Sequence, residues 1–381
     1  MTLRLPPFLA DVSVLDLSIW RPGPYATSLL VGLGADVLKV EPPGGDPMRH
    51  YPELFESVNA GKRSIVLDLK DTAAGGGRAR ALELAAVADV VVEGFRPGVV
   101  ARLGVGDAAV RARNPGVVYC SISGYGQEGP MAPVPGHDLN YQAWAGALAP
   151  DGGAAAMPPL PLADLASGMA AAFGICAALV GRDASTGAGV AGSGAYLDVS
   201  MTDVMATWTG TARSTSDQEG GTGPVGVGDQ GEGARAGDKR RRAPGESSVP
   251  GYGLFDTVDG GQVALGVVNE QHFWSALCGA LGLTALAGIP FGERMQRAVE
   301  LTDAVADAIR SHRRDELVTD LLAAGVPAAP VLDRAGMTAA APFPAFPIRL
   351  GNSLGAALPP APALDQHRGQ GFRRADSGQS R

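Results

Sequence analysis

The stretch Val12–Val40, VSVLDLSIWRPGPYATSLLVGLGADVLKV, decides the fold class. Its pattern predicts a β-strand over Val12–Leu17, a helix over Tyr25–Leu33 that Gly34 closes, and a second strand over Asp36–Val40. The same alternation continues along the chain, with predicted strands at Ile65–Leu69, Asp89–Val92 and Val117–Ile122 and an Ala/Leu-rich helix at Arg78–Val87. Strands that alternate with helices are typical of βαβ units, so the chain is predicted to be α/β, with a Rossmann-like large domain around a mostly parallel sheet.

The turn after the first strand, SIWRPGP, contains no GxGxxG motif, so the dinucleotide fingerprint is absent. Further along, helical patterns are expected at Leu139–Leu148 and at Asp164–Leu179.

The composition then divides the chain. Residues 211–250 are rich in Gly, Ser, Asp and Arg and are expected to form a flexible polar insert. Its basic run Lys239–Arg242 is either a solvated cluster or a phosphate contact. A hairpin is expected over Tyr252–Val268, followed by helices to about residue 324. These features predict a large domain over 1–210, completed by 335–381, and a smaller α+β domain over 251–334.

The charge excludes one class of partner. The chain has 31 Lys and Arg against 39 Asp and Glu, a net charge of −8, which argues against nucleic acid. No apolar run approaches the length of a membrane span, so a cytoplasmic protein without a membrane partner is expected. Three widely spaced cysteines indicate free thiols rather than disulfides, and the histidines show no metal-binding spacing, so no metal site is predicted.

Four blocks of sequence resemble one protein family, in the family's order. They are VLDLSIWRPGPYATSLLVGLGADVLKVEPPGGDPMR, FESVNAGKRSIVLDLK, ADVVVEGFRPGVVARLG with NPGVVYCSISGYGQEGP, and PPLPLADLASGMAAAFGICAAL. By these blocks the chain is identified as a member of the family III (CaiB/BaiF-type) CoA-transferases, which include formyl-CoA transferase and α-methylacyl-CoA racemase. The resemblance implies an interlocked homodimer that takes acyl-CoA as substrate and holds no permanent cofactor, coenzyme A being part of the substrate.

Coenzyme A carries phosphates, and positioned cations at strand ends and in loops can bind them. The resemblance implies a CoA site formed by Trp20, Arg21, Lys62, Arg63, Phe95, Arg96 and Arg102. Surface solubility is the alternative role of each arginine. Gly94 stands where the family often has Asn, and Pro42 where formyl-CoA transferase has Arg, so the phosphate contacts are expected to be redistributed.

Asp164 is the residue on which the resemblance bears most. In the transferases the matching aspartate attacks the acyl-CoA carbonyl and passes through an acyl-aspartyl anhydride to an aspartyl-CoA thioester. An Asp before an Ala-rich helix is also a common N-cap, and that reading stays open.

His137, in PGHDLNYQAWAGAL, resembles the histidine of the racemases. Inversion of an α-carbon needs a base on one face and an acid on the other, which His137 and Asp164 would supply. The alternative is that His137 only caps the following helix. The family's supporting residue would be Glu270 or Asn269, although NEQHFW also resembles the transferases.

The sequence therefore predicts an acyl-CoA enzyme, with α-proton transfer on a 2-methylacyl-CoA narrowly preferred. CoA transfer to a free acid through Asp164 is the alternative, and a non-catalytic CoA-binding subunit is a further one.

Overall fold

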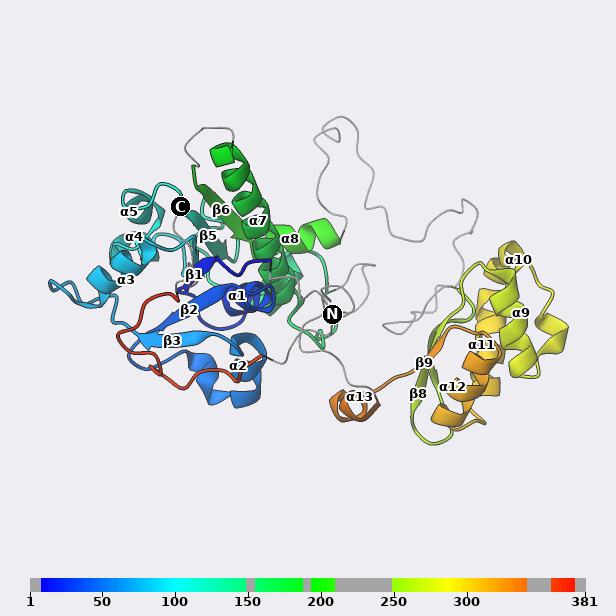
Figure 1. Ribbon diagram of the computed structural model, residues 1–381. Helices are drawn as coiled ribbons and strands as arrows, with labels where there is room; N and C mark the ends of the chain where they lie inside the picture. The colour runs from blue at the N-terminus through cyan, green and yellow to red at the C-terminus, as the bar shows by residue number, and fades with distance from the viewer. Residues whose placement is uncertain (1–7, 149–154, 188–192, 210–248, 341–357, 374–381) are drawn as a thin grey trace, which may run out of the picture. The chain divides into compact units, whose positions relative to one another are not determined.

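The computed structural model describes residues 8–148, 155–187, 193–209, 249–340 and 358–373. The chain divides into two compact units, residues 1–230 with 344–381 and residues 231–343. The predicted insert at 211–250 lies almost wholly outside the described residues, as does the basic run within it. Each unit is described by itself (Figure 1).

The first unit is built on a six-stranded parallel sheet with the order β3-β2-β1-β4-β5-β6. The strands are β1 (Ser13–Asp16), β2 (Asp36–Glu41), β3 (Arg63–Val66), β4 (Val90–Glu93), β5 (Val118–Ser123) and β6 (Ala195–Ser200). The helices are α1 (Pro22–Gly32), α2 (Pro52–Asn59), α3 (Gly77–Ala85), α4 (Val99–Leu103), α5 (Asp107–Arg111), α6 (Asp138–Trp144), α7 (Leu162–Gly187) and α8 (Met201–Trp208), with the 3-10 turn η1 (Pro47–His50). This strand order is that of a Rossmann fold, so the predicted fold class of this unit is confirmed.

Both faces of the sheet are buried, because neighbouring residues of one strand enter different cores. Val14 packs with α1 and α7 in one core, whereas Leu15 packs with α3 in the other, and both are fully buried. Such two-sided burial explains the continuous apolar strands that the sequence showed.

Helix α7 is long and apolar enough over Leu162–Ala184 to cross a membrane, by length and composition alone. Its residues Ala163, Ala171 and Ile175 are fully buried in the core beneath α1, so in this unit α7 packs as a core helix. Of the predicted thiols, Cys120 and Cys278 are buried, Cys176 is half-buried, and all three are free.

Residues 358–373 run along β3, which would otherwise be an edge of the sheet (Figure 1, red). The backbone N–H of His367 donates to the Ser64 carbonyl oxygen at 2.9 Å, and the N–H of Ser64 donates to His367 Nδ1 at 3.2 Å. The N–H of Val66 donates to Asp365 Oδ1 at 2.8 Å. The unpaired polar groups of β3 are thus satisfied by the C-terminal segment.

The second unit has a small antiparallel sheet, β7-β8-β9, covered by helices. The strands are β7 (Tyr252–Asp256), β8 (Gln262–Gly266) and β9 (Ala328–Pro330), and the helices are α9 (Gln271–Ala280), η2 (Thr284–Leu286), α10 (Phe291–Gln296), α11 (Ala298–Ile309), α12 (Arg314–Ala323) and α13 (Arg334–Ala340). Trp274 and Leu277 of α9 are fully buried in its core with Val263 of β8. The predicted hairpin is present, and β9 joins it as a third strand.

Candidate active site

The strand order of the parallel sheet reverses between β1 and β4. In open α/β sheets, ligands bind outside the carboxyl ends of the strands at such a point. Here Ser18 follows β1 and Gly94 follows β4, and a Cβ on Gly94 would lie 3.7 Å from Ser18 Cβ. The segments SIWRPG and GFRPG therefore begin side by side at the expected position of a ligand.

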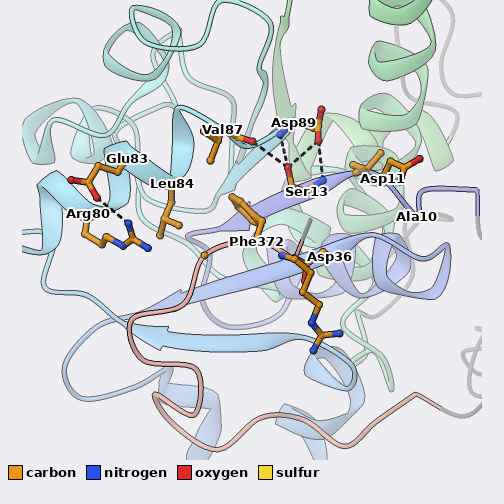
Figure 2. A pocket seen from close by; sticks show the side chains of 13 residues that line it. Ala10, Asp11, Ser13, Asp36, Arg80, Glu83, Leu84, Val87, Asp89 and Phe372 are labelled. Carbon is orange, nitrogen blue, oxygen red and sulfur yellow. Dashed lines mark hydrogen bonds and ion pairs between the residues drawn. The ribbon is translucent and has the colours of Figure 1, made fainter. Parts of the chain in front are cut away.

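A pocket of about 640 Å³ lies instead at the amino ends of the strands (Figure 2). Ser13, Asp36 and Asp89 line it, and their polar groups are engaged within the protein. Asp36 pairs with Arg63 at 2.7 Å, and Asp89 accepts hydrogen bonds from Ser13. We do not assign the chemistry to this pocket, because Trp20 and Arg21 of the predicted site follow the carboxyl end of β1, and Phe95 and Arg96 follow that of β4.

The turn after β1 has a constrained backbone. Trp20 has φ 62°, a left-handed conformation that a bulky side chain rarely adopts, and its side chain is 43% exposed. Arg21 then precedes α1 as its N-cap residue. Gly23 has to be glycine, because a Cβ there would lie 2.2 Å from Ser18 Oγ. The turn is thus tightly folded, and it presents Trp20 and Arg21 at the start of α1.

Asp164 is the third residue of α7, in its first turn, so the prediction that it is the N-cap is wrong. Its backbone N–H donates to Asp138 Oδ1 at 3.1 Å. Burial raises the pKa of the Asp164 carboxyl to about 7, the nearby Asp138 adds to the rise, and the positive charge of Arg21 opposes it. A partly buried carboxyl with this pKa changes charge near neutrality, which is unusual for an aspartate.

Close helix packing brings Asp164 to the start of α1. A Cβ on Gly168, one turn after Asp164, would lie 2.7 Å from the Pro22 carbonyl oxygen and 2.9 Å from Tyr25 Cδ1. Only glycine permits this approach, so the first turns of α7 and α1 are in direct contact. Arg21 acts on the pKa of Asp164 for this reason.

His137 is exposed and precedes α6 as its N-cap residue, in agreement with one of its two predicted roles. Its backbone N–H donates to Asn140 Oδ1 at 3.0 Å, which fixes the start of the helix. Asp138, rather than His137, contacts Asp164 directly, and Gln142 Nε2 holds the other carboxylate oxygen of Asp138 at 2.5 Å. The pairing of His137 with Asp164 stays a prediction.

Tyr141, on the same helix, is a site residue that sequence reasoning missed. Its hydroxyl donates to the Gly136 carbonyl oxygen at 2.5 Å, and its ring occupies the space that a Cβ on Gly124 would need. Burial raises the pKa of Tyr141 to about 12, Asp164 contributes to the rise, and Arg96 lowers it. Tyr141 therefore lies within electrostatic reach of both Asp164 and Arg96. The signal in the sequence was its place in the GHDLNY segment, together with Gly124 and Gly136, which leave room for its ring.

Comparison with known proteins identifies the family. CoA-transferase family III matches residues 9–345. The chain belongs to this family. The acetyl-CoA:oxalate CoA-transferase of Acetobacter aceti is 34% identical over 345 residues, covering 84% of this chain and 79% of that protein. The alpha-methylacyl-CoA racemase of Homo sapiens is 32% identical over 279 residues, covering 72% and 65%.

A solved CaiB/BaiF family protein from Brucella suis is 26% identical, with a TM-score of 0.74 over 93% of this chain and 96% of that one. Membership of an enzyme family is therefore established for the chain. Named CoA-transferases and one racemase are among the similar proteins, so the transferase alternative fits better than the narrow preference for proton transfer drawn from sequence.

Three residues that family III resemblance assigned to CoA follow the carboxyl end of β4. Arg96 and Arg102 are exposed, so their guanidinium groups face solvent. Phe95 is partly buried against the second core of the first unit, and its N–H donates to Glu93 Oε2 at 2.7 Å. The structure thus leaves Arg96 of the GFRPG segment and Arg102 of α4 available to a polyanionic ligand.

Lys62 and Arg63 do not match the role that the resemblance implied. Lys62 Nζ is buried and donates to Asp16 Oδ2 at 3.1 Å, Pro24 O at 2.8 Å and Asn59 Oδ1 at 3.0 Å, which uses all three of its donors. Arg63, at the amino end of β3, makes a two-pronged ion pair with Asp36. Lys62 has no free donor for a phosphate, and Arg63 is buried and held by Asp36 and the Gly371 carbonyl oxygen, so we leave both out of the proposed site.

Asn269 and Glu270 belong to the second unit and are described within it. Arg294, which is buried, donates to the Asn269 carbonyl oxygen at 3.2 Å. Glu270 is the N-cap residue of α9, and its Oε2 accepts the N–H of Val268 at 3.3 Å. Their predicted catalytic role stays a prediction. No cluster of three or more His, Cys, Asp or Glu that could hold a metal occurs in the part of the chain that the structure describes.

Proposed function

We propose that this chain is a CoA-transferase that moves CoA from an acyl-CoA to a free carboxylic acid, with Asp164 as the nucleophile. The observation that carries the proposal is the Asp164 carboxyl, whose pKa of about 7 is set by burial and by Asp138 beside the opposing charge of Arg21. Such a carboxylate is more basic than an ordinary aspartate, and is therefore a better nucleophile. The named CoA-transferases similar to this chain support the assignment.

The reaction proceeds in four acyl exchanges at one carboxylate. An Asp164 oxygen attacks the thioester carbonyl and expels the CoA thiolate, which leaves an acyl-aspartyl anhydride. The thiolate attacks the Asp164 carbonyl, releases the first acid and forms an aspartyl-CoA thioester. The acceptor carboxylate attacks that thioester and again expels the thiolate, which finally attacks the new acyl carbonyl and regenerates Asp164. Each step replaces one reactive acyl bond by another, and no proton is consumed.

The surrounding residues have distinct roles in this proposal. Arg21 supplies positive charge beside Asp164, where the attacked carbonyl oxygen becomes negative. Asp138 holds the Asp164 backbone N–H and thereby fixes the first turn of α7. Arg96 and Arg102 would bind phosphates of coenzyme A, and Trp20, which is exposed, directly precedes Arg21 in the SIWRPG turn.

Trapping tests the proposal directly. The full chain is incubated with acetyl-CoA or succinyl-CoA, hydroxylamine is added, and peptides are examined by mass spectrometry. We expect a hydroxamate at Asp164, formed only when acyl-CoA is present, and none in Asp164→Asn. The matched control Ser167→Ala, one turn along α7, should trap as well as the wild type. Active transfer of CoA without any adduct at Asp164 would exclude the proposed nucleophile.

Proton transfer at the α-carbon is the second candidate, favoured by the GHDLNY segment and by similarity to the human racemase. It predicts that a chiral 2-methylacyl-CoA takes up deuterium at its α-carbon in heavy water, and that His137→Ala abolishes the uptake. Uptake without any hydroxamate at Asp164 would favour this reading over CoA transfer.

We further propose a cytoplasmic homodimer, with a large domain over 1–210 and 335–381 and a small domain over 251–334. Support for the dimer comes from α7, where Met169, Phe173 and Val180 are 51%, 77% and 71% exposed at helical spacing. An apolar stripe of this kind is typical of an interface. Light scattering on the wild type and on Phe173→Glu tests it: the variant should be monomeric, and a monomeric wild type would contradict the proposal. A stable dimer that binds CoA without turnover would instead indicate a binding subunit.

A further inference from the structure

A buried ion pair lies beneath the SIWRPG turn. Lys39 Nζ on β2 is 2.9 Å from Asp46 Oδ2, and neither side chain is exposed. Lys39 Nζ also donates to the Ser18 carbonyl oxygen at 2.8 Å, so one ammonium group joins the end of β1 to the segment after β2. Burying two charges is unfavourable by itself, and replacing such a pair by apolar groups is often neutral or stabilising. This pair therefore needs an explanation other than stability.

Asp46 connects the ion pair to the backbone of Trp20. Its Oδ1 accepts the N–H of Trp20 at 3.2 Å and that of Met48 at 2.9 Å. The N–H of Asp46 itself donates to Glu41 Oε2 at 2.9 Å, so the carboxylate is fixed from both sides. Trp20 is the residue held at φ 62°. A strained backbone conformation persists only where its surroundings enforce it, and Asp46 supplies that enforcement.

We infer that the Lys39–Asp46 pair is a positioning device, which holds Trp20 left-handed so that Arg21 stands opposite Asp164. The inference rests on the proposed function of Asp164 as nucleophile. Neither Lys39 nor Asp46 touches the reacting atoms in this scheme. Lys39 and Asp46 fix the backbone of the SIWRPG turn, and this turn places Arg21 beside Asp164.

The geometry links the pair to Asp164 in two steps. Lys39 binds the carbonyl oxygen of Ser18, and Asp46 binds the N–H of Trp20, two residues later. Arg21 is the next residue and is the N-cap of α1. The close contact at Gly168, one turn after Asp164, then fixes the start of α7 against α1. The charged and titratable groups that face Asp164 are Asp138 and Tyr141 from α6 and Arg21 from the turn. Arg21 is the one cation among these three, so displacing it removes the group that favours the Asp164 carboxylate.

The test compares Asp46→Ala, which removes the acceptor of the Trp20 N–H, and the neutral double variant Lys39→Met/Asp46→Ala with the wild type. Single-turnover acylation of Asp164 by acyl-CoA is followed from pH 5 to 9, beside the KM for acyl-CoA. In both variants we expect the midpoint of the acidic limb of this rate profile to rise by half to one pH unit. Such a rise lowers the acylation rate about three- to tenfold at pH 6. Above pH 8.5 the loss should be clearly smaller than at pH 6, because Asp164 is then ionised in every variant and only the stabilisation of the attacked oxygen by Arg21 is weakened. If the single variant fails to fold, the double variant still allows the test, since it removes both charges of the pair and leaves neither of them buried alone.

The control is Arg182→Met, which breaks the 3.1 Å ion pair with Asp89 near the other end of α7. It should leave the midpoint of the acidic limb unchanged. A merely structural role for Lys39 and Asp46 would lower the rate by the same factor at all pH values, and that outcome, or an unmoved midpoint, overturns the inference.

A second readout separates this inference from the proposed function. The carboxyl ¹³C resonance of Asp164, identified by its loss in Asp164→Asn, is titrated in the free protein without substrate. If the wild type never forms an acyl-enzyme, the proposed function fails. The resonance still decides the inference, because its midpoint must rise in the double variant and stay fixed in Arg182→Met.

Discussion

Replacing Asp164 by Asn should abolish CoA transfer. The same variant should also have a higher free energy of unfolding than the wild type, by an amount that grows as the pH increases. The carboxyl has a pKa of about 7 in the folded chain, against an ordinary value of 3.8. Below pH 3.8 this carboxyl is protonated in both the folded and the unfolded chain, so it does not lower the free energy of unfolding. Above that pH the unfolded chain loses its proton first, so stability falls as the pH rises towards 7 and then levels off. Asn has nearly the same shape and no proton to lose.

The magnitude follows from the difference of about three pKa units, each worth about 1.4 kcal/mol. Asp164 lowers the free energy of unfolding of the wild type by about 1.7 kcal/mol at pH 5 and by about 4 kcal/mol at pH 8. The difference in this free energy between Asp164→Asn and the wild type should therefore grow by about 2.5 kcal/mol between these two pH values. Urea unfolding at both pH values measures the gain, and the titration of all other groups cancels when the two proteins are compared.

Ser167→Ala is the matched control, because Ser167 lies one turn further along α7, its hydroxyl donates to the backbone carbonyl oxygen of Asp164, and the change removes no titratable group. Its difference from the wild type should not vary with pH. If the Asp164→Asn difference is also constant between pH 5 and 8, the carboxyl is not perturbed in the free protein, and the reasoning from burial and Asp138 is refuted.

Further consequences concern packing, catalysis and the buried charges. Gly168→Ala should lower the free energy of unfolding by about 1–3 kcal/mol in urea titrations, because its methyl group would overlap the backbone of α1. Gly174→Ala, on the same helix with its nearest neighbour at 3.5 Å, should lose nothing, and equal losses would contradict the packing argument. The rate of Asp164 acylation should rise with pH to half its maximum near pH 7, since only the carboxylate attacks, and a flat profile from pH 5.5 to 8.5 would exclude this. Lys62→Met should cost about 3–5 kcal/mol in urea unfolding because it leaves Asp16 buried and unpaired, whereas Lys62→Met/Asp16→Asn should recover much of the loss. No recovery in the double variant would show that charge is not the cause.

The parallel sheet could be predicted from sequence because its strands are apolar and its turns are marked by glycine and proline. The expected strand over Asp36–Val40 and the observed β2 agree within one residue. The strand expected at Ile65–Leu69 begins two residues earlier, at Arg63, because Asp36 neutralises the arginine and allows it into the sheet. β6 (Ala195–Ser200) was missed, since it is an edge strand in which exposed and part-buried residues alternate.

The candidate site was predictable only where one residue type carries the signal. Asp164 stands out in the sequence because the family pattern and the helix start coincide there. Asp138 and Tyr141 did not stand out, because their importance depends on contacts between α6 and α7 that no spacing along the chain reveals. Lys62 shows the opposite error. A lysine after glycine suggests an exposed cation, yet Lys62 is buried by three acceptors, of which Asp16 and Pro24 are distant in the chain.

The segment at 358–373 affects how the protein must be made. It pairs with β3 across a separation of 303 positions between Ser64 and His367, and the whole second unit lies between them in the chain. While the polypeptide is being synthesised, β3 therefore remains an open sheet edge until residues 358–373 have left the ribosome. Contacts of such long range form slowly, and open edges pair with other chains. The nascent protein is consequently prone to aggregate until this segment emerges, and a stop codon directly before residue 358 should destabilise the first unit by exposing the edge of β3.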